Sequence, residues 1–355
     1  MQHTPEKTPF PIFDGHNDTL LKLEIDAIKG NERSFFDRSE TGHLDFVRAK
    51  EAGFSGGLFA MFVPSNPEQD FTKPFDPKDP VNFQEVPQEQ AYKFTMRMVE
   101  RAERIEADSE GSVVICRTAE ENRTAINAGK LAVSLHIEGA EAIDTDFKAL
   151  EELHSKGLRS IGPVWSRENA FACGVPMSYP ASPDIGPGLT DAGYDLVRAC
   201  NKLGVLLDVS HLNEKGFWDL ARTTDRPIVA SHSNAHSICA SSRNLTDKQL
   251  DAIKESDGLV GINFHVAFLR PDGRFQKDTP LEVIADHAVY LVERLGEDRV
   301  ALGSDFDGCI APQELSDVTG LPRLFETLSA RGFSSAALEK IAYKNWISAL
   351  EKAAA

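Results

Sequence analysis

The sequence predicts a single (β/α)8 barrel of the TIM type that spans residues 1–355, and two observations support this fold class. Eight short apolar runs, each followed by polar residues, recur along the chain. Such runs are typical of parallel strands that are buried on both faces. Between most of these runs lie segments with the apolar spacing of amphipathic helices. Strands that alternate with helices favour a parallel barrel, and the length of the chain suits one such domain.

The strands and helices follow in order along the chain. Strands are expected at residues 11–18, 53–63, 131–140, 158–166, 204–211, 227–233, 258–265 and 300–308. Helices are expected at residues 89–105, 190–204, 246–256, 280–296 and 334–353. Thr190 and either Thr246 or Asp247 are suited to cap two of these helices. Residues 64–88 and 165–189 are rich in Pro, Asp and Gly, and we expect them to form long loops over the active-site face.

Composition and charge exclude several classes of partner. The formal net charge is −17, which argues against nucleic acid or an anionic membrane, since both attract basic surfaces. The N-terminal residues lack a basic segment followed by an apolar run, and no apolar run approaches 20 residues. Neither a signal peptide nor a membrane-spanning helix is therefore expected. The five cysteines are scattered, odd in number and without CxxC spacing, so we expect buried thiols and a cytoplasmic location.

Six polar side chains stand at the C-terminal ends of expected strands. They are His16, Asp18, Glu138, His211, His232 and Asp305. One histidine at a strand end is more often a hydrogen-bonded structural residue. The ends of parallel barrel strands, however, meet at one face, where barrel enzymes carry their active sites. Three imidazoles and three carboxylates there predict a site for zinc or a similar divalent ion.

The number of these groups favours two metal ions. Six exceed what one tetrahedral zinc ion requires, so we expect two ions bridged by a carboxylate. Glu138 is the expected bridge, because both of its oxygens can bind and its strand lies between the other candidates. Positions i and i+2 of a strand share a side, so His16 and Asp18 can reach one ion. Two ions about 3.5–4 Å apart can hold a bridging hydroxide and polarise a carbonyl oxygen.

At this point the chain resembles the membrane (renal) dipeptidase family, a branch of the amidohydrolase-type barrels. The motifs that carry the resemblance include "DGHNDTLL", "HIEGAEAI", "SHSNAHSICASSRN" and "GSDFDG". The resemblance implies two zinc ions, with another divalent ion as the alternative, a dipeptide substrate and a homodimer. One zinc ion would be bound by His16, Asp18 and Glu138, and the other by Glu138, His211 and His232.

The same resemblance implies roles for two further residues. Arg243 would hold the terminal carboxylate of the dipeptide, a task that suits the guanidinium fork. Asp305 would take the proton from the metal-bound water and pass it to the leaving amine. Asp307, two residues later, is the second candidate for that proton transfer. Asp14 is expected to orient a ligand or to shape a turn.

One departure from the family concerns the substrate side. Many members carry a histidine that contacts the substrate at the end of the fourth strand, whereas this chain has Trp165. An indole N–H can donate a hydrogen bond but cannot carry the charge of an imidazolium. Asn169 matches the family's asparagine, and Arg167 is placed to compensate for the lost charge.

Three functions remain open at this stage. The first is a zinc dipeptidase, and the second is a hydrolase of another small amide, a lactam or an ester on the same barrel, since the fold alone does not decide the chemistry. The third is a non-catalytic metal- or ligand-binding protein, which the presence of Asp305 beside all five ligand positions disfavours. The preferred side chains, and the tolerance for a C-terminal D-residue, stay open.

Overall fold

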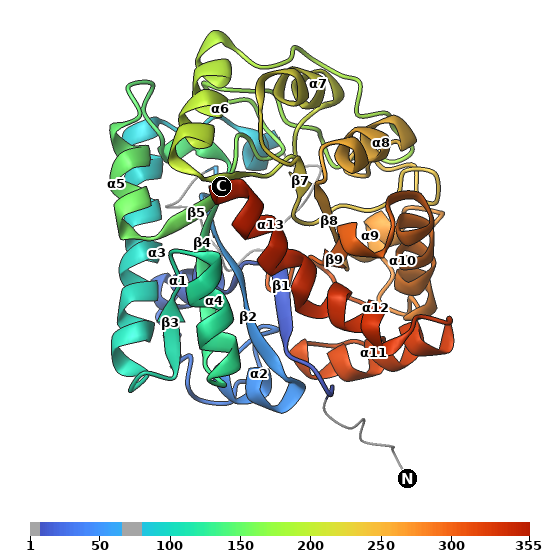
Figure 1. The fold of residues 1–355 in the computed structure, drawn as a ribbon. Helices are drawn as coiled ribbons and strands as arrows, with labels where there is room; N and C mark the ends of the chain where they lie inside the picture. Colours follow the sequence, from blue (N-terminus) through green and yellow to red (C-terminus); the bar gives the residue numbers. More distant parts are fainter. Residues whose placement is uncertain (1–7, 66–79) are drawn as a thin grey trace.

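Parallel strands form the centre of the molecule in the computed structural model, which describes residues 8–65 and 80–355 (Figure 1). One sheet has the order β1-β2-β4-β5-β6, with β3 paired to β4, and a second has the order β7-β8-β9. The strands are β1 (Ile12–Asn17), β2 (Phe54–Phe62), β3 (Val113–Ile115), β4 (Leu131–Glu138), β5 (Leu158–Gly162), β6 (Leu206–Leu207), β7 (Val229–Ala230), β8 (Leu259–Ile262) and β9 (Val300–Leu302).

Two parallel bridges join these sheets into a ring. Asp208 pairs with Val229 between β6 and β7, and Asn17 pairs with Phe306 between β1 and the segment after β9. At the second junction the Asp18 amide also donates a 2.7 Å hydrogen bond to the Phe306 carbonyl. The predicted barrel is therefore confirmed, and each of the eight expected strands is present. The short strand β3 was not predicted, and it lies outside the ring on the edge of β4.

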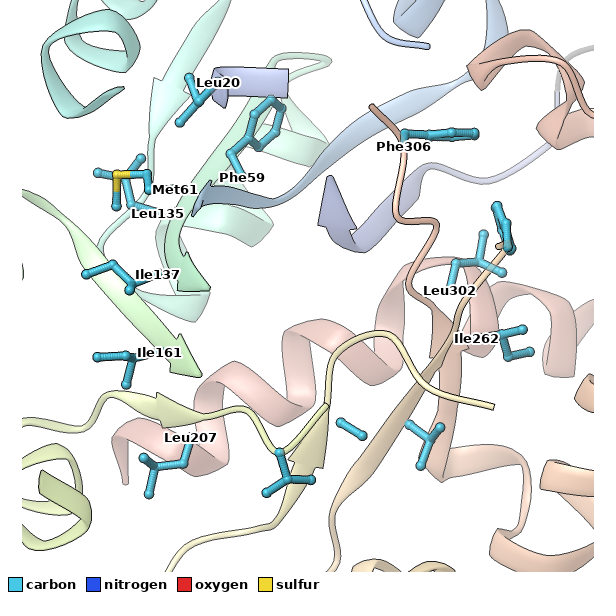
Figure 2. Close-up of a cluster of buried hydrophobic side chains, with 14 of the residues drawn as sticks. Leu20, Phe59, Met61, Leu135, Ile137, Ile161, Leu207, Ile262, Leu302 and Phe306 are labelled. Carbon is cyan, nitrogen blue, oxygen red and sulfur yellow. The ribbon is translucent and has the colours of Figure 1, made fainter. Parts of the chain in front are cut away.

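Strand β4 shows how the two-residue period of a strand separates core from site. Val133, Leu135 and Ile137 belong to the large apolar cluster between the strands and the surrounding helices. The alternate residues, among them His136 and Glu138, point to the other side of the strand, into the barrel. Figure 2 shows the outer cluster around the ring, with Leu20, Phe59, Met61, Leu135, Ile137, Ile161, Leu207, Ile262, Leu302 and Phe306 labelled.

The helices surround the strands (Figure 1). They are α1 (Thr19–Ile28), α2 (Phe46–Ala52), α3 (Gln88–Asp108), α4 (Ala119–Asn127), α5 (Lys148–Lys156), α6 (Asp191–Leu203), α7 (Glu214–Thr223), α8 (Asp247–Glu255), α9 (Val266–Leu269), α10 (Glu282–Leu295), α11 (Leu321–Ala330), α12 (Ser335–Glu339) and α13 (Asn345–Ala354). Short 3-10 segments are η1 (Pro80–Phe83), η2 (Ala140–Ala142), η3 (Glu297–Arg299) and η4 (Val318–Gly320).

All five expected helices are found. The Thr190 side chain caps α6 by accepting from the Gly193 amide. Thr246, rather than Asp247, caps α8, and it forms a capping box with Gln249. The C-terminal pattern, expected as one helix, is divided into α12 and α13 by the π-helical turn η5 (Lys340–Lys344).

Helix α13 closes the end of the barrel opposite to the strand C-termini, and it crosses the centre of the view in Figure 1. Its Trp346 is fully buried and donates a 2.7 Å hydrogen bond from Nε1 to the Leu302 carbonyl. This side chain belongs to a second apolar cluster with inward residues such as Phe13 of β1 and Leu206 of β6. A side chain at Gly15 would collide with the indole ring, so the close approach of β1 and α13 requires glycine there.

One expected loop is present, and four of the five cysteines are buried as expected. Residues 165–189 contain no helix or strand. In the other expected loop, residues 66–79 lie outside the described residues. All five cysteines fall within the described ranges and none is in a disulfide; four are buried as expected, whereas Cys309 is partly exposed. Among residues 8–65 and 80–355, no helix is long and apolar enough to cross a membrane.

Candidate active site

The six strand-end side chains lie together at the C-terminal face of the barrel. His16 is the last residue but one of β1 and Glu138 ends β4, while Asp305 follows β9. Closely spaced donor atoms among the described residues form three groups that could hold a metal ion: Glu138, His211 and His232; His16, Asp18 and Asp305; and His16, Asp208 and His232. The first is one of the two ligand sets that the family resemblance implies, whereas the second has Asp305 in the place expected for Glu138. Five of the six side chains are buried, and Asp305 is partly exposed.

Glu138 lies between two pairs of candidate ligands, and each of its carboxylate oxygens faces one pair. Its Oε1 is 2.8 Å from Nε2 of His211 and 3.4 Å from Nε2 of His232. Its Oε2 is 3.7 Å from Nε2 of His16, and that nitrogen is 3.4 Å from Oδ2 of Asp18. The two carboxylate oxygens therefore belong to two different sets of donor atoms, as a bridging ligand requires.

These separations fit tetrahedral metal coordination. Ligand atoms about 2.0–2.1 Å from a tetrahedral zinc ion are roughly 3.3 Å from one another. The distances around both oxygens of Glu138 lie close to that value, and Nε2 of His211 is 3.1 Å from Nε2 of His232. Both ring nitrogens of His16 and Oδ1 of Asp18 are buried without a hydrogen-bond partner. Buried polar atoms without a hydrogen-bond partner lower the stability of the fold unless a cation binds them. The donor set therefore fits a divalent metal ion.

The ionisation of the site also favours a cation. Burial raises the pKa of Glu138 well above its usual value, although the nearby His16 opposes the shift. Burial lowers the pKa of His16, but Glu138 and Asp18 outweigh it and raise that pKa to about 10. Burial, together with the charge of Arg243, holds the pKa of His211 well below the usual value, and burial does the same for His232. His211 and His232 are therefore neutral imidazoles, the form that binds a metal ion, whereas the proton that the carboxylates hold on His16 would be displaced by a bound cation.

Hydroxyl groups orient two of the imidazoles. Ser231 Oγ lies 2.5 Å from Oδ2 of Asp208 and 2.7 Å from Nδ1 of His232. An ionised carboxylate only accepts, so Ser231 donates to Asp208 and accepts from the His232 N–H. This pattern leaves the lone pair of Nε2 free to face Glu138. Ser166 Oγ lies 2.9 Å from Nδ1 of His211 and holds that ring in the same way.

Arg243 lies against the metal-ligand candidates and is only 3% exposed. Its guanidinium donates to the Ser210 carbonyl, and one amino group lies 3.2 Å from Nε2 of His211. The Nε atom is buried without a hydrogen-bond partner, and the guanidinium stacks over Phe268 at 5.3 Å. Burial lowers the pKa of Arg243 to about 10, although Asp305 and Glu138 oppose the shift. A buried cation of this kind is suited to an anionic partner.

The two carboxylates of the "SDFDG" motif have different surroundings. Asp305 is in the group with His16 and Asp18, at the centre of the site. Asp307 instead accepts from the Thr19 hydroxyl at 2.9 Å and from the His43 amide at 2.6 Å. Both oxygens of Asp307 thus accept hydrogen bonds, one from the start of α1 and one from the loop before α2, which disfavours Asp307 as the proton carrier.

Asp14 lies behind the site, as expected for a residue that orients its neighbours. The side chain accepts from the amide and from the hydroxyl of Ser304, each at 2.7 Å. The Ser304 hydroxyl lies also 3.2 Å from the His16 carbonyl. Burial raises the pKa of Asp14 to about 6, although these hydrogen bonds oppose the shift. Asp14 therefore links β9 to the strand that carries His16.

Trp165 lies in an aromatic wall beside the candidate metal ligands and is 5% exposed. Its ring centroid is 4.8 Å from Phe62, 5.4 Å from Phe83 in a stacked arrangement, and 6.0 Å from His211. The guanidinium of Arg167 lies over the Trp165 ring at 5.3 Å. The indole therefore stands at the edge of the site, where the sequence comparison placed the family's histidine.

The charge of Arg167 is neutralised within the protein. Its Nε donates to Glu141 at 2.7 Å, and another nitrogen donates to the Val63 carbonyl at 2.7 Å. Both partners of the Arg167–Glu141 pair are buried. The suggestion that Arg167 replaces the missing imidazolium charge is therefore disfavoured.

Asn169 is the predicted substrate residue that the geometry supports least. Its Nδ2 donates to the Pro163 carbonyl at 2.9 Å. Its Oδ1 accepts from the amides of Phe171 and Ala172 at 2.9 and 3.1 Å. Both ends of the amide thus shape the loop after β5, and we do not include Asn169 in the proposed substrate site.

Several residues of the site were missed in the sequence. Asp208 and Asn263 are fully or almost fully buried and contact strand-end residues from neighbouring strands. Each lies at the C-terminal end of an apolar run, which is the signal that singled out His16 and Glu138. His136 was set aside as a packed barrel histidine, and its Nδ1 indeed lies 2.9 Å from the Ser160 hydroxyl.

A parallel barrel that gathers histidines and carboxylates around a central glutamate at the C-terminal ends of its strands is typical of metal-dependent hydrolases. The family model "Membrane dipeptidase (Peptidase family M19)" matches residues 6–355 of this chain. The chain therefore belongs to the membrane dipeptidase family, whose members are metal-dependent dipeptidases.

Similar proteins agree with this assignment. A metallo peptidase from Rhodobacter sphaeroides, solved with a phosphinate mimic of the dipeptide L-Ala-D-Ala, is 45% identical with a TM-score of 0.91, covering 97% of this chain and 99% of that one. Dipeptidase AC, also a metallo peptidase, is 46% identical with a TM-score of 0.90, covering 98% of this chain and all of that one. The Klebsiella pneumoniae protein named "Uncharacterized protein in pqqA 5'region" is 50% identical over 245 residues, which are 69% of this chain and 90% of that protein.

Proposed function

We propose that this protein is a dinuclear zinc dipeptidase that hydrolyses the peptide bond of dipeptides. The observation that carries the proposal is the position of Glu138, whose two oxygens face two separate sets of donor atoms. His16 and Asp18 would complete the first ion's ligands. His211 and His232 would complete those of the second.

The residues of the site have separate roles in the proposed hydrolysis. When bound, two divalent ions polarise the scissile carbonyl and activate a water molecule for attack. Asp305 takes the proton of that water and gives it to the leaving amine, since it is the partly exposed carboxylate of the site. Arg243 pairs with the free carboxylate of the substrate, which lies one residue beyond the scissile bond in a dipeptide. Tripeptides should consequently be poor substrates.

The substrate range includes dipeptides with a C-terminal D-residue. A phosphinate mimic of L-Ala-D-Ala is the ligand of the similar Rhodobacter sphaeroides metallo peptidase, which supports this extension. The aromatic wall of Trp165, Phe62 and Phe83 bounds the site on the side of His211 and favours substrates with apolar bulk near the scissile carbonyl. A homodimer and a cytoplasmic location stay predictions of the sequence.

The test is a dipeptide library with L,L and L,D members, assayed on protein of measured metal content. We expect about two ions per chain and turnover of dipeptides but not of tripeptides. Turnover confined to blocked amides, lactams or esters would instead favour the second candidate, a different small-amide or ester hydrolase. That candidate draws its support from Trp165, whose indole cannot supply the positive charge of the histidine that many relatives carry.

A further inference from the structure

We propose that Asn263 is a positioning residue that orients the carboxylate of Asp305 for proton transfer. Asn263 follows β8 and is completely buried, and its Nδ2 lies 2.9 Å from Oδ2 of Asp305. The inference rests on the proposed function, because it gives Asn263 its effect through the proton-carrying role of Asp305.

The orientation of the Asn263 amide follows from two partners whose hydrogen-bonding roles are fixed. Its oxygen accepts from the backbone amide of His265 at 2.6 Å, and that amide can only donate. Its nitrogen lies 3.3 Å from the carbonyl of His232, which can only accept. The group that faces Asp305 is therefore an N–H donor. A hydrogen bond from it to an ionised carboxylate is among the stronger kinds in proteins.

Asn263 is itself held rigidly. The side chain of Asn234 accepts from the Asn263 amide at 3.1 Å and donates to the Asn263 carbonyl at 2.9 Å. Asn234 is also completely buried. The backbone of Asn263 is thus fixed on both sides, and its side chain joins a metal-ligand candidate, His232, to Asp305. Rigid support of this kind is what a catalytic group needs to keep its geometry.

The backbone of Asp305 is equally constrained. Only the rotation of its carboxylate is left to be restricted by a neighbouring side chain. Its φ of 61° lies in the left-handed region, which is uncommon for residues other than glycine. Its amide donates to the carbonyl of His16 at 2.9 Å. Its Oδ1 and the Oδ2 of Asp18 both lie where a side chain on Gly308 would stand. One oxygen of Asp305 thus meets Asn263, and the other lies next to the candidate metal ligand Asp18.

This arrangement separates the tasks of the two oxygens. The N–H of Asn263 holds Oδ2, so Oδ1 stays on the side of Asp18 and is the oxygen that takes the proton. Without the donor, the carboxylate can rotate and spends less time in the productive orientation, which lowers the rate of proton transfer rather than substrate binding.

The experiment compares Asn263→Ala with Asn263→Asp, which keeps the shape but replaces the donor by an acceptor. We expect kcat to fall about 10- to 100-fold in each variant, with KM changed about twofold or less and the metal content per chain unchanged. Asn345→Ala is the matched control. Asn345 on α13 is also buried and donates to two backbone carbonyls, those of Glu297 and Val300, at the far end of the barrel. It should lower the melting temperature and leave kcat unchanged.

A double-mutant comparison shows whether Asn263 acts through Asp305. In an Asp305→Asn background, Asn263→Ala should lower kcat by less than about threefold, because the carboxylate to be oriented is gone. An undiminished effect in that background, or wild-type kcat in both single Asn263 variants, would overturn the inference. If Asn263→Ala does not fold, Asn263→Asp carries the same comparison. Full turnover by Asp305→Asn alone would contradict the proposed function instead, so the two failures are distinguishable.

Discussion

Removing Arg243 should slow the hydrolysis of dipeptides with a free carboxylate and leave their C-terminal amides nearly unaffected. The guanidinium is almost completely buried next to His211, and its Nε has no hydrogen-bond partner. A substrate carboxylate would supply both the missing acceptor and the missing negative charge. Arg243→Ala removes this partner while the ligand candidates around Glu138 stay in place.

The burial of the Arg243 guanidinium sets the expected loss in kcat/KM. A hydrogen bond to a charged group contributes about 1.5–3 kcal/mol, and the upper part of this range applies where water is excluded. Since 1.36 kcal/mol is a factor of ten, kcat/KM for a free dipeptide should fall about 10- to 150-fold. A dipeptide amide carries no terminal charge, so its kcat/KM should fall about threefold or less.

The assay measures kcat/KM for a dipeptide and for its amide with wild-type protein and with Arg243→Ala, both at known metal content. Arg101→Ala is the control, because Arg101 is also buried and pairs with Glu24 at 2.6 Å away from the site. It should alter stability and not the preference for free dipeptides. Equal losses for the dipeptide and its amide in Arg243→Ala would refute the carboxylate contact and favour a hydrolase of other small amides or esters.

Three further outcomes follow from the structure. Glu138→Ala should lose both metal ions together in elemental analysis, and the loss of only one ion or of neither would contradict the bridge. Asp305→Asn should keep its metal but lose about 10²- to 10⁴-fold in kcat, measured on metal-loaded protein, since an amide cannot take the proton. Although burial raises the pKa of Asp317, hydrogen bonds from Thr319 and Arg48 lower it below the usual value. The ionised form therefore stabilises the fold above about pH 3.9, and this stabilisation is lost as the pH falls through the lower folded-state pKa. Asp317→Asn should lower the free energy of unfolding by about 1–2 kcal/mol at pH 7, and by progressively less as the pH falls below 3.8, in urea unfolding.

The strands and the strand-end residues could be predicted because their signals are local. A short apolar run followed by a polar residue, as at Ile12–Asn17 and Leu131–Glu138, is visible without knowledge of any neighbour. Parallel topology then brings every such end to one face, which is why His16 and Glu138 could be placed together across more than a hundred residues. The caps at Thr190 and Thr246 were predictable for the same reason, since a cap depends on three or four consecutive residues.

The contacts that orient the site depended on the tertiary structure. The donation from Ser231 to Asp208, and the donation from Asn263 to Asp305, each join residues from different strands. Their distances depend on strand register and on backbone angles such as the positive φ of Asp305, which a sequence pattern does not specify. Asn169 was assigned to the substrate from a local match to the family's motif. In the folded chain both ends of its side-chain amide instead form hydrogen bonds within the loop after β5. The sequence alone thus determined which side chains reach the active face. The packing of strand against strand decided which atoms meet there, because a hydrogen bond requires a separation of about 3 Å that only the assembled barrel defines.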